Sequence, residues 1–259
     1  MSKDNKEIGT IDLLRVFARG LLIQASWSFE RMQSLGFAYA IEPVLRKLYP
    51  VQSEYESRLK LHMGYFNTQP YLASFILGAV VRLEQDRALG IKTDADVQGL
   101  KSSLMAPLGA LGDSFFWGSF KPLVAVTAAA LVMTGSWWAP LLFLVLYNIG
   151  HLGLRVSVLF RGYETGGDAV DLMARYRFTS WARLFKVTSL AVLGGLLGMM
   201  PLWRTEFRNE GAMPGIIEAL AGMMIVLVLV EILRRGGSPV KVMLGLAAVC
   251  LVLAYGGVI

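Results

Sequence analysis

Polar and aromatic side chains that could do chemistry are gathered in four clusters of an otherwise apolar chain. Their amides, hydroxyls and rings form neutral hydrogen bonds and offer apolar faces to a ligand. The clusters are Ile23 to Phe37 (IQASWSFERMQSLGF), His62 to Pro70 (HMGYFNTQP), Ala106 to Pro122 (APLGALGDSFFWGSFKP) and Leu146 to Arg155 (LYNIGHLGLR). Gln24 and Gln33 of the first cluster are weak candidates for ligand contact, whereas the second and third clusters hold stronger ones.

The second cluster contains the amide pair Asn67 and Gln69. Two neighbouring amides provide donors and acceptors together, which suits the neutral hydroxyls of a sugar better than a carboxylate would. Pro70 is a suitable first residue for a helix over the apolar run that follows. Asn67 and Thr68 could instead cap that helix, and the sequence leaves both interpretations open.

The third cluster places Asp113 between a glycine-rich apolar run and an aromatic run. An ionisable residue in such surroundings is by default a functional candidate, and the Trp117 ring could lie against a sugar ring. Gly112 and Gly118 permit tight turns or the close approach of another segment. The alternative is a capped turn between two half-helices, with Asp113 bonded to backbone amides. The predicted substrate contacts are Asn67, Gln69, Asp113 and Trp117.

Structural roles are predicted for several other polar residues. Glu30 and Arg31 adjoin Trp27, a combination that favours a subunit or domain contact over ligand binding. His151 lies in an apolar run and His62 has no motif around it, whereas a phosphoryl-carrying histidine must be exposed to a soluble donor. The sequence lacks a Walker glycine loop, an HExxH motif and a GxSxG motif. We therefore predict no catalytic residue, no bound metal and no cofactor.

The composition predicts a membrane protein. Hydrophobic residues make up 55% of the chain and charged residues 17%, below the roughly 25% of a soluble domain. Pro122 to Leu154 has no charged residue, as expected where a mid-membrane charge costs at least about 2.5–3.5 kcal/mol. The net charge of +6 indicates basic cytoplasmic loops rather than nucleic-acid binding. The single cysteine, Cys250, excludes an internal disulfide.

Three apolar runs in the C-terminal third predict transmembrane helices. A spanning helix needs about 20 apolar residues. Val187 to Trp203 and Val242 to Ile259 meet this directly, and Ala219 to Val230 meets it when extended back to Met213. Basic residues precede the first run and join the second to the third, so the positive-inside rule places the C-terminus outside. The polar N-terminus lacks the apolar core of a signal peptide and is expected to stay in the cytoplasm.

The middle of the chain predicts a broken membrane core. Pro122 to Leu154 would form a helix of about 50 Å, too long for a hydrocarbon core of about 30 Å, so we predict two segments joined by a turn. Asn67 to Val81 and Ser102 to Gly112 are too short to span, which predicts re-entrant or interfacial segments, or helices buried in protein. Short broken segments flanked by glycine and proline are typical of a transport site. The polar stretch Arg82 to Lys101 is expected to be a solvated connection.

An amphipathic helix is predicted at Thr10 to Leu22, with Thr10 as its N-cap. The residues on its apolar face are Ile11, Leu14, Phe17, Ala18 and Leu21. A membrane-surface helix and a helix packed on the protein both fit this pattern. The predicted fold is thus an all-α integral membrane protein with amphipathic N-terminal helices, short broken or re-entrant segments and about three C-terminal transmembrane helices. We expect three parts: a cytoplasmic or interfacial region 1–66, a membrane core 67–160 and a C-terminal transmembrane region 161–259.

In order and spacing, QASWSFERMQSLGF, FNTQP and GDSFFWG resemble the IID subunit of bacterial sugar phosphotransferase systems (PTS) of the mannose/fructose/sorbose family. The resemblance runs from about Thr10 to the C-terminus and includes GYETG at Gly162 to Gly166. Ser114 departs from a proline common after the GD, and the loop Arg204 to Glu210 is shorter than in many members. These departures bear on substrate identity rather than on membership.

The resemblance implies a multi-pass protein of the bacterial cytoplasmic membrane that is not an enzyme on its own. Family members pair with a membrane subunit IIC to form the sugar path, in a higher oligomer of IIC–IID pairs. A soluble IIB subunit, charged through IIA, phosphorylates the hexose as it emerges, and IID carries no phosphorylation site. The alternative is a membrane scaffold that recruits PTS proteins without moving sugar. A stand-alone ion-coupled transporter, a third possibility, predicts uptake without phosphoenolpyruvate.

Overall fold

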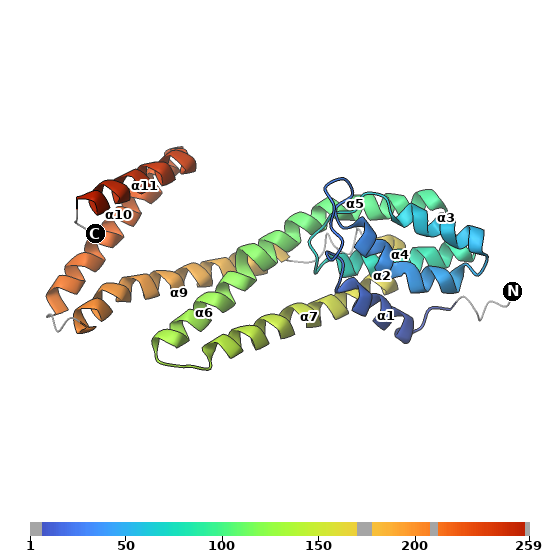
Figure 1. Ribbon diagram of the computed structural model, residues 1–259, viewed down its shortest axis with the longest axis horizontal. Helices are drawn as coiled ribbons and strands as arrows, with labels where there is room; N and C mark the ends of the chain where they lie inside the picture. The colour runs from blue at the N-terminus through green and yellow to red at the C-terminus, as the bar shows by residue number, and fades with distance from the viewer. Residues whose placement is uncertain (1–6, 170–177, 208–211, 257–259) are drawn as a thin grey trace. The chain divides into compact units, whose positions relative to one another are not determined.

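The protein is described from a computed structural model, in which residues 7–169, 178–207 and 212–256 are placed (Figure 1). No strand occurs among these residues, where only isolated bridges join Ser28 to Met32 and Met32 to Phe66. The prediction of an all-α protein is therefore confirmed. The helices are α1 (Thr10–Gly20), α2 (Ser34–Leu48), α3 (Gln52–His62), α4 (Ala73–Ala88), α5 (Asp94–Gly112), the π-helix η2 (Asp113–Phe120), α6 (Lys121–Met133), α7 (Ala139–Thr165), η3 (Gly166–Asp168), α9 (Phe178–Phe207), α10 (Ala212–Arg234) and α11 (Pro239–Tyr255).

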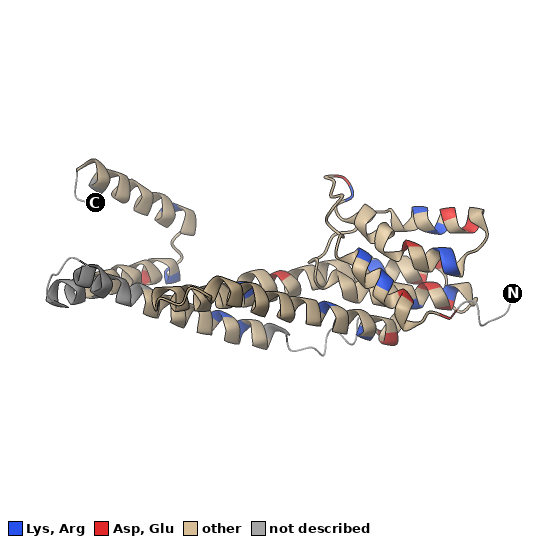
Figure 2. Ribbon diagram, turned by 60° about the horizontal axis from the view of Figure 1, so that its bottom comes forward, with Lys and Arg blue, Asp and Glu red and all other residues tan. Residues whose placement is uncertain are grey.

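The chain forms two compact units, Met1–Ser189 and Leu190–Ile259. In the first unit, the continuous helix Asp94–Met133 and the helix Ala139–Asp168 are long and apolar enough to cross a membrane. Charged side chains gather on α1 to α5 and are sparse along α6 and α7 (Figure 2). The three-part division expected from the sequence concerns placement relative to a membrane, and it stays a prediction.

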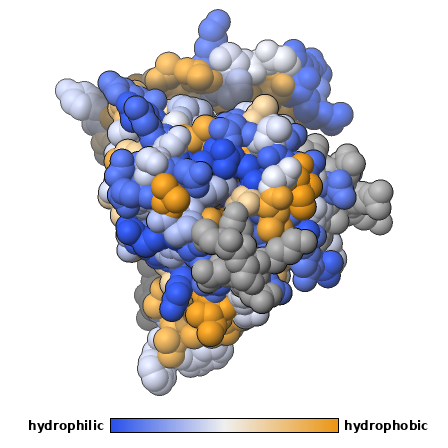
Figure 3. All heavy atoms as spheres, turned by 90° about the vertical axis from the view of Figure 1, so that its right-hand side faces the viewer, coloured by the Kyte–Doolittle hydropathy of each residue, from blue (hydrophilic) through white to orange (hydrophobic). Residues whose placement is uncertain are grey.

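Helix α4 forms the centre of the N-terminal bundle, because its residues Ala73 to Val81 are all buried. Of the alternatives for Asn67 to Val81, the structure supports a helix buried in protein. The predicted solvated connection from Arg82 to Lys101 is wrong, since α4 continues to Ala88 and α5 begins at Asp94. The polar composition misled the prediction because a buried ion pair neutralises part of it: Glu84 is fully buried and bound to Arg58. The end of the bundle that carries α3 shows many hydrophilic residues with several apolar patches among them (Figure 3).

Two glycines allow α4 and α7 to cross at backbone contact. A Cβ on Gly78 would lie 2.0 Å from the carbonyl oxygen of Leu159, and a Cβ on Gly162 would lie 2.2 Å from that of Phe75. Small residues at helix crossings permit such close approach. The crossing anchors the long helix α7 in the bundle core, where Leu159 is also buried.

The stretch from Pro122 to Leu154 is split into two helices, as predicted. Helix α6 ends at Met133 and α7 begins at Ala139. Gly135 in the turn has φ of 82°, a conformation that glycine adopts without strain. The alternative of a capped turn at Asp113 is wrong, because α5, η2 and α6 continue as one helix through the glycine-rich run.

Helix α1 begins one residue earlier than the prediction places it. Gly9, not Thr10, is the N-cap, and its amide donates to the Asp12 carboxylate at 3.1 Å. Leu13 and Val16 pack into the core. Of the predicted apolar stripe, Ile11, Leu14, Ala18 and Leu21 are exposed, and only Phe17 packs partly against the core. The helix therefore packs on the protein through a different face from the one that the periodicity indicates.

The C-terminal apolar runs lie in helices, as expected. Val187 to Trp203 falls within α9, Met213 to Val230 within α10 and most of Val242 to Ile259 within α11. The expected external loop Arg204 to Glu210 is partly helical, since α9 continues to Phe207, and its remainder lies outside the described residues. The end of the third predicted span, 257–259, also lies outside them.

Candidate functional site

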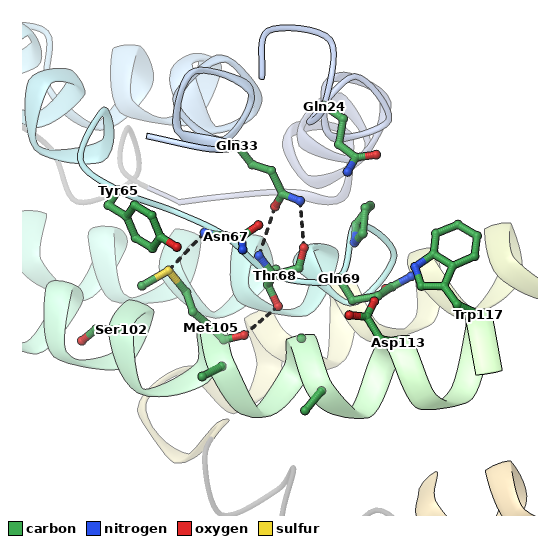
Figure 4. Close-up of a pocket in the computed structure, with 14 residues that line it drawn as sticks. Gln24, Gln33, Tyr65, Asn67, Thr68, Gln69, Ser102, Met105, Asp113 and Trp117 are labelled. Atoms are coloured by element: carbon green, nitrogen blue, oxygen red, sulfur yellow. Dashed lines mark hydrogen bonds between the residues drawn. The ribbon is translucent and has the colours of Figure 1, made fainter. Parts of the chain in front are cut away.

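A cavity of about 540 Å³ opens between three segments of the N-terminal unit (Figure 4). Its walls are the loop between α1 and α2, the segment before α4, and the face of α5 that continues into η2. The polar lining residues are Gln24, Gln33, Tyr65, Asn67, Thr68, Gln69, Ser102 and Asp113, and the others are Pro70, Met105, Ala106, Gly109, Ala110 and Trp117. Ligand pockets usually enclose about 300–1,000 Å³, so a monosaccharide fits. The structure brings all four predicted substrate contacts into this one cavity.

Backbone hydrogen bonds fix the segment that presents Asn67. Gln33 Nε2 donates to the Thr68 carbonyl at 2.8 Å, and the Thr68 amide donates to Gln33 Oε1 at 3.3 Å. Thr68 Oγ1 donates to the Met105 carbonyl at 2.9 Å, so it does not cap α4. The Asn67 side chain is exposed and makes no hydrogen bond to the described residues. Its amide is therefore free for a ligand on a segment held from both sides.

Gln69, rather than Asn67 or Thr68, caps the turn that leads into α4. Its Oε1 accepts from the Tyr71 amide at 2.8 Å and the Leu72 amide at 3.0 Å, which satisfies two donors just before the helix begins at Ala73. Its Nε2 has no hydrogen-bond partner among the described residues. Gly112 makes room for this side chain, since a Cβ there would lie 2.5 Å from Gln69 Cβ. Gln69, a predicted substrate contact, thus takes the capping role that the sequence suggests for Asn67 or Thr68. Its side-chain oxygen is used for capping, and its side-chain nitrogen makes no hydrogen bond to the described residues.

Asp113 and Trp117 lie on η2, close to Gln69 at one end of the cavity (Figure 4). The Asp113 side chain is exposed and forms no ion pair with the described residues. Trp117 is 42% exposed, and its ring lies 5.6 Å from that of Tyr71 and 5.1 Å from Lys121 Nζ. π-Helical segments within α-helices are frequent at functional sites. Gly118 has only ordinary contact in reach, 3.6 Å from the Asp113 carbonyl, so its predicted close approach is not seen.

The loop between α1 and α2 holds the predicted contact residues Trp27, Glu30 and Arg31. All three are exposed and none lines the cavity. Trp27 packs edge-on against Phe29, with ring centroids 5.5 Å apart. Glu30 and Arg31 form no ion pair with the described residues, and the Arg31 carbonyl accepts from the Phe66 amide at 3.4 Å. Their assignment to a subunit contact stays a prediction.

Several lining residues receive little weight from the sequence. Gln33 is a weak candidate by its surroundings, yet it clamps Thr68. Tyr65 lies in the second cluster but is assigned no role by the sequence, and Ser102 and Met105 lie outside all four clusters. Ser102 and Met105 reach the cavity because α5 runs beside the segment before α4. Ser102, Met105 and Gly109 are spaced three and four residues apart and therefore lie on one face of α5. This spacing by itself does not identify them as cavity residues.

The family described as "PTS system mannose/fructose/sorbose family IID component" matches residues 7–259. The chain belongs to this IID family. The mannose-specific EIID component of Escherichia coli K12 is 38% identical over 194 residues, covering 74% of this chain and 69% of that protein. The fructose permease IID component of Bacillus subtilis is 26% identical and covers 93% and 94%.

Solved structures resemble this IID chain over nearly its full length. A chain of the mannose transporter ManYZ in complex with microcin E492 matches with a TM-score of 0.60 and 30% identity, covering 97% of this chain and 98% of that one. A structure titled only as a membrane protein matches with a TM-score of 0.76 and 31% identity over the same shares. The likeness supports a permease subunit that acts with membrane partners in a PTS complex.

Outside the cavity lining, this IID chain contains a buried ion network centred on Glu84. Its carboxylate accepts from His62 Nε2 at 2.8 Å, from Tyr49 Oη at 2.8 Å and from Arg58 through two nitrogens. Burial alone would raise the pKa of Glu84, but the hydrogen bonds and the Arg58 charge outweigh it and lower the pKa to about 2. Burial lowers the pKa of His62, so a neutral imidazole donates through Nε2. His62 is fully buried, in keeping with its predicted structural role.

Proposed function

We propose that this IID chain is a translocation subunit of a mannose-type PTS permease. With a IIC subunit it would form the path for a hexose that IIB phosphorylates as it emerges. The observation that carries the proposal is the convergence of Asn67, Gln69, Asp113 and Trp117 on one cavity. Free amide groups, a carboxylate and an exposed indole are the groups that bind sugar hydroxyls and the apolar face of a sugar ring.

The mechanism follows from where the free groups lie. The unused Asn67 amide would donate hydrogen bonds to sugar hydroxyls and accept them, the Asp113 carboxylate would accept hydrogen bonds from hydroxyls, and Trp117 would cover the ring face. The ends of the segment before α4 are held by Gln33 and by the Gln69 cap, so these groups are preorganised for binding. Phosphorylation by IIB would then trap the sugar as a charged ester inside the cell. The chain would span the bacterial cytoplasmic membrane several times, with the N-terminus inside and the C-terminus outside.

Substitution of the two free polar groups tests the proposal. Asn67→Ala and Asp113→Asn should each lower phosphoenolpyruvate-dependent hexose uptake, while the variant chain still co-purifies with IIC. Gln52→Ala and Asp168→Asn are matched controls, because both residues are exposed and lie outside the cavity. Lost uptake with intact assembly supports the translocation subunit. Unchanged uptake, or assembly with soluble PTS proteins and no IIC, supports the scaffold instead.

A further inference from the structure

Tyr71 joins the wall of the cavity to the long helix α7. Its amide is held by Gln69 Oε1 at 2.8 Å, and its ring lies 5.6 Å from that of Trp117. The same ring packs edge-on against Phe116, with centroids 4.7 Å apart. Tyr71 itself does not line the cavity. Tyr71 therefore contacts two of the proposed substrate contacts, Gln69 and Trp117, from outside the cavity lining.

Three residues on one face of α7 contact Tyr71. His151 stacks on the Tyr71 ring with centroids 4.5 Å apart and planes 12° apart. Tyr147 and Tyr71 share a hydrogen bond between their hydroxyls at 3.0 Å, and the Arg155 guanidinium lies 5.6 Å from the ring. Residues four apart share a helix face, so 147, 151 and 155 form one stripe. None of the three lines the cavity.

Two residues of this stripe, His151 and Arg155, are polar although they are buried, and Tyr147 is half-buried. His151 and Arg155 are only 9% and 5% exposed. His151 Nδ1 and Arg155 Nε have no hydrogen-bond partner among the described residues. Burying unsatisfied polar groups destabilises a fold, whereas apolar side chains would pack two helices without that loss. The polar stripe therefore indicates a role beyond holding α7 against the bundle.

Arg155 also reaches the opposite wall. Its Nη2 donates to the Gly20 carbonyl at 2.8 Å, at the C-terminal end of α1 where a cation is favoured. The loop that carries Gln24 and Gln33 begins at the next residue, and both of those side chains line the cavity. Arg155 is thus in contact with the supports of two cavity walls.

We propose that Tyr71, His151 and Arg155 are positioning residues that set the geometry of the cavity according to the position of α7. The inference rests on the proposed function for its effect on sugar affinity, but its structural core does not. A shift of α7 would move Tyr71, and through it Gln69 and Trp117. The helix that is apolar enough to cross a membrane would in this way control the site that holds the sugar.

The structural core is tested on the purified full chain in detergent. Five of the six tryptophans are replaced by phenylalanine to leave Trp117 as the reporter. His151→Ala should change the emission maximum and the quenching of Trp117, and His151→Phe, which keeps a flat ring on Tyr71, should restore them. Ile149→Ala is the control, because Ile149 is exposed on the same helix. An unchanged Trp117 signal in His151→Ala overturns the proposal whatever the chain transports.

The functional consequence is tested in membrane vesicles that contain the IIC partner, with D-mannose, D-fructose and L-sorbose as probes. His151→Ala should raise KM about tenfold with little change in Vmax, a loss of about 1.4 kcal/mol. On a Trp117→Ala background it should raise KM by clearly less than tenfold, because only the path from Tyr71 through Gln69 remains. Additive effects contradict the relay. If Trp117→Ala leaves KM unchanged, the proposed sugar site fails, and the fluorescence still decides the relay.

Discussion

A single methyl group added at Gly112 should impair the cavity by displacing Gln69, although none of the four proposed substrate contacts is itself replaced. The added Cβ in Gly112→Ala would lie 2.5 Å from Gln69 Cβ and 3.0 Å from Gln69 Oε1. Carbon atoms in contact lie about 3.5–4.0 Å apart. Gln69 must therefore move by about 1 Å or more, and its two hydrogen bonds to the start of α4 would be lost or distorted.

Gly109→Ala is a matched control on the same helix. Gly109 also lines the cavity, but a Cβ there would lie 3.9 Å from Thr68, at ordinary contact distance. Both substitutions gain about 1 kcal/mol of helix propensity. Only Gly112→Ala also loses two hydrogen bonds of about 0.5–1.5 kcal/mol each. Its net stability change is therefore small, about 0–2 kcal/mol, so the chain should still fold.

The effect on transport should be larger than the effect on stability. Misplacement by about 1 Å costs up to about 100-fold in a preorganised site, and we expect KM for hexose uptake to rise about 10- to 100-fold in Gly112→Ala. Uptake kinetics in vesicles, with thermal unfolding of the same samples, measure both quantities. Gly109→Ala should stay near wild type in both. If the two variants show the same KM, the Gln69 cap does not shape the site and the reasoning is refuted.

Three further substitutions test the packing around the site. Ionised Glu84 should contribute about 3 kcal/mol to the free energy of unfolding above pH 4.5, because its pKa is lowered from 4.5 to about 2. This contribution should be lost as the pH falls from 4.5 toward 2. Glu84→Gln should therefore flatten this part of a plot of melting temperature against pH. Gly78→Ala places a Cβ 2.0 Å from a backbone oxygen of α7 and should destabilise the chain by about 1–3 kcal/mol or more. Gly153→Ala is the control and should leave stability unchanged, because a Cβ there has nothing within 4 Å. Equal yields of folded protein from the two variants would contradict the close crossing of α4 and α7. Gln33→Leu leaves two backbone groups of Thr68 without partners, so unfolding should become easier by about 1–3 kcal/mol, and an unchanged melting temperature would show that the clamp is dispensable.

The fold class and the split of the central apolar stretch follow from simple patterns. Absence of charge and helix length suffice to place a turn between Pro122 and Leu154, because both are local properties. The four substrate candidates meet in one cavity because polar groups in an apolar chain are costly and tend to collect where they are used.

Long-range pairing explains what the sequence does not show. Glu84 looks solvent-facing until Arg58, far away in the chain, is known to neutralise it. Gly112 suggests a turn by its composition, yet it serves the close packing of Gln69 inside a continuous helix. The outward stripe of α1 is as apolar as its buried face, so periodicity alone selects the wrong one. Each of these errors depends on a contact between segments that no local pattern encodes.

Protection of a cavity cysteine by sugar tests the central claim most directly. Cys250 is the single native cysteine, so Ala110→Cys in a Cys250→Ser background gives one thiol in the cavity lining. Labelling of this thiol with a bulky methanethiosulfonate should block hexose uptake, and a saturating concentration of the transported hexose should slow the labelling. The control is Thr134→Cys in the α6–α7 turn, which should be labelled without loss of uptake and without protection by hexose. Complete labelling of the cavity thiol with normal uptake and no protection would contradict a sugar path through this cavity.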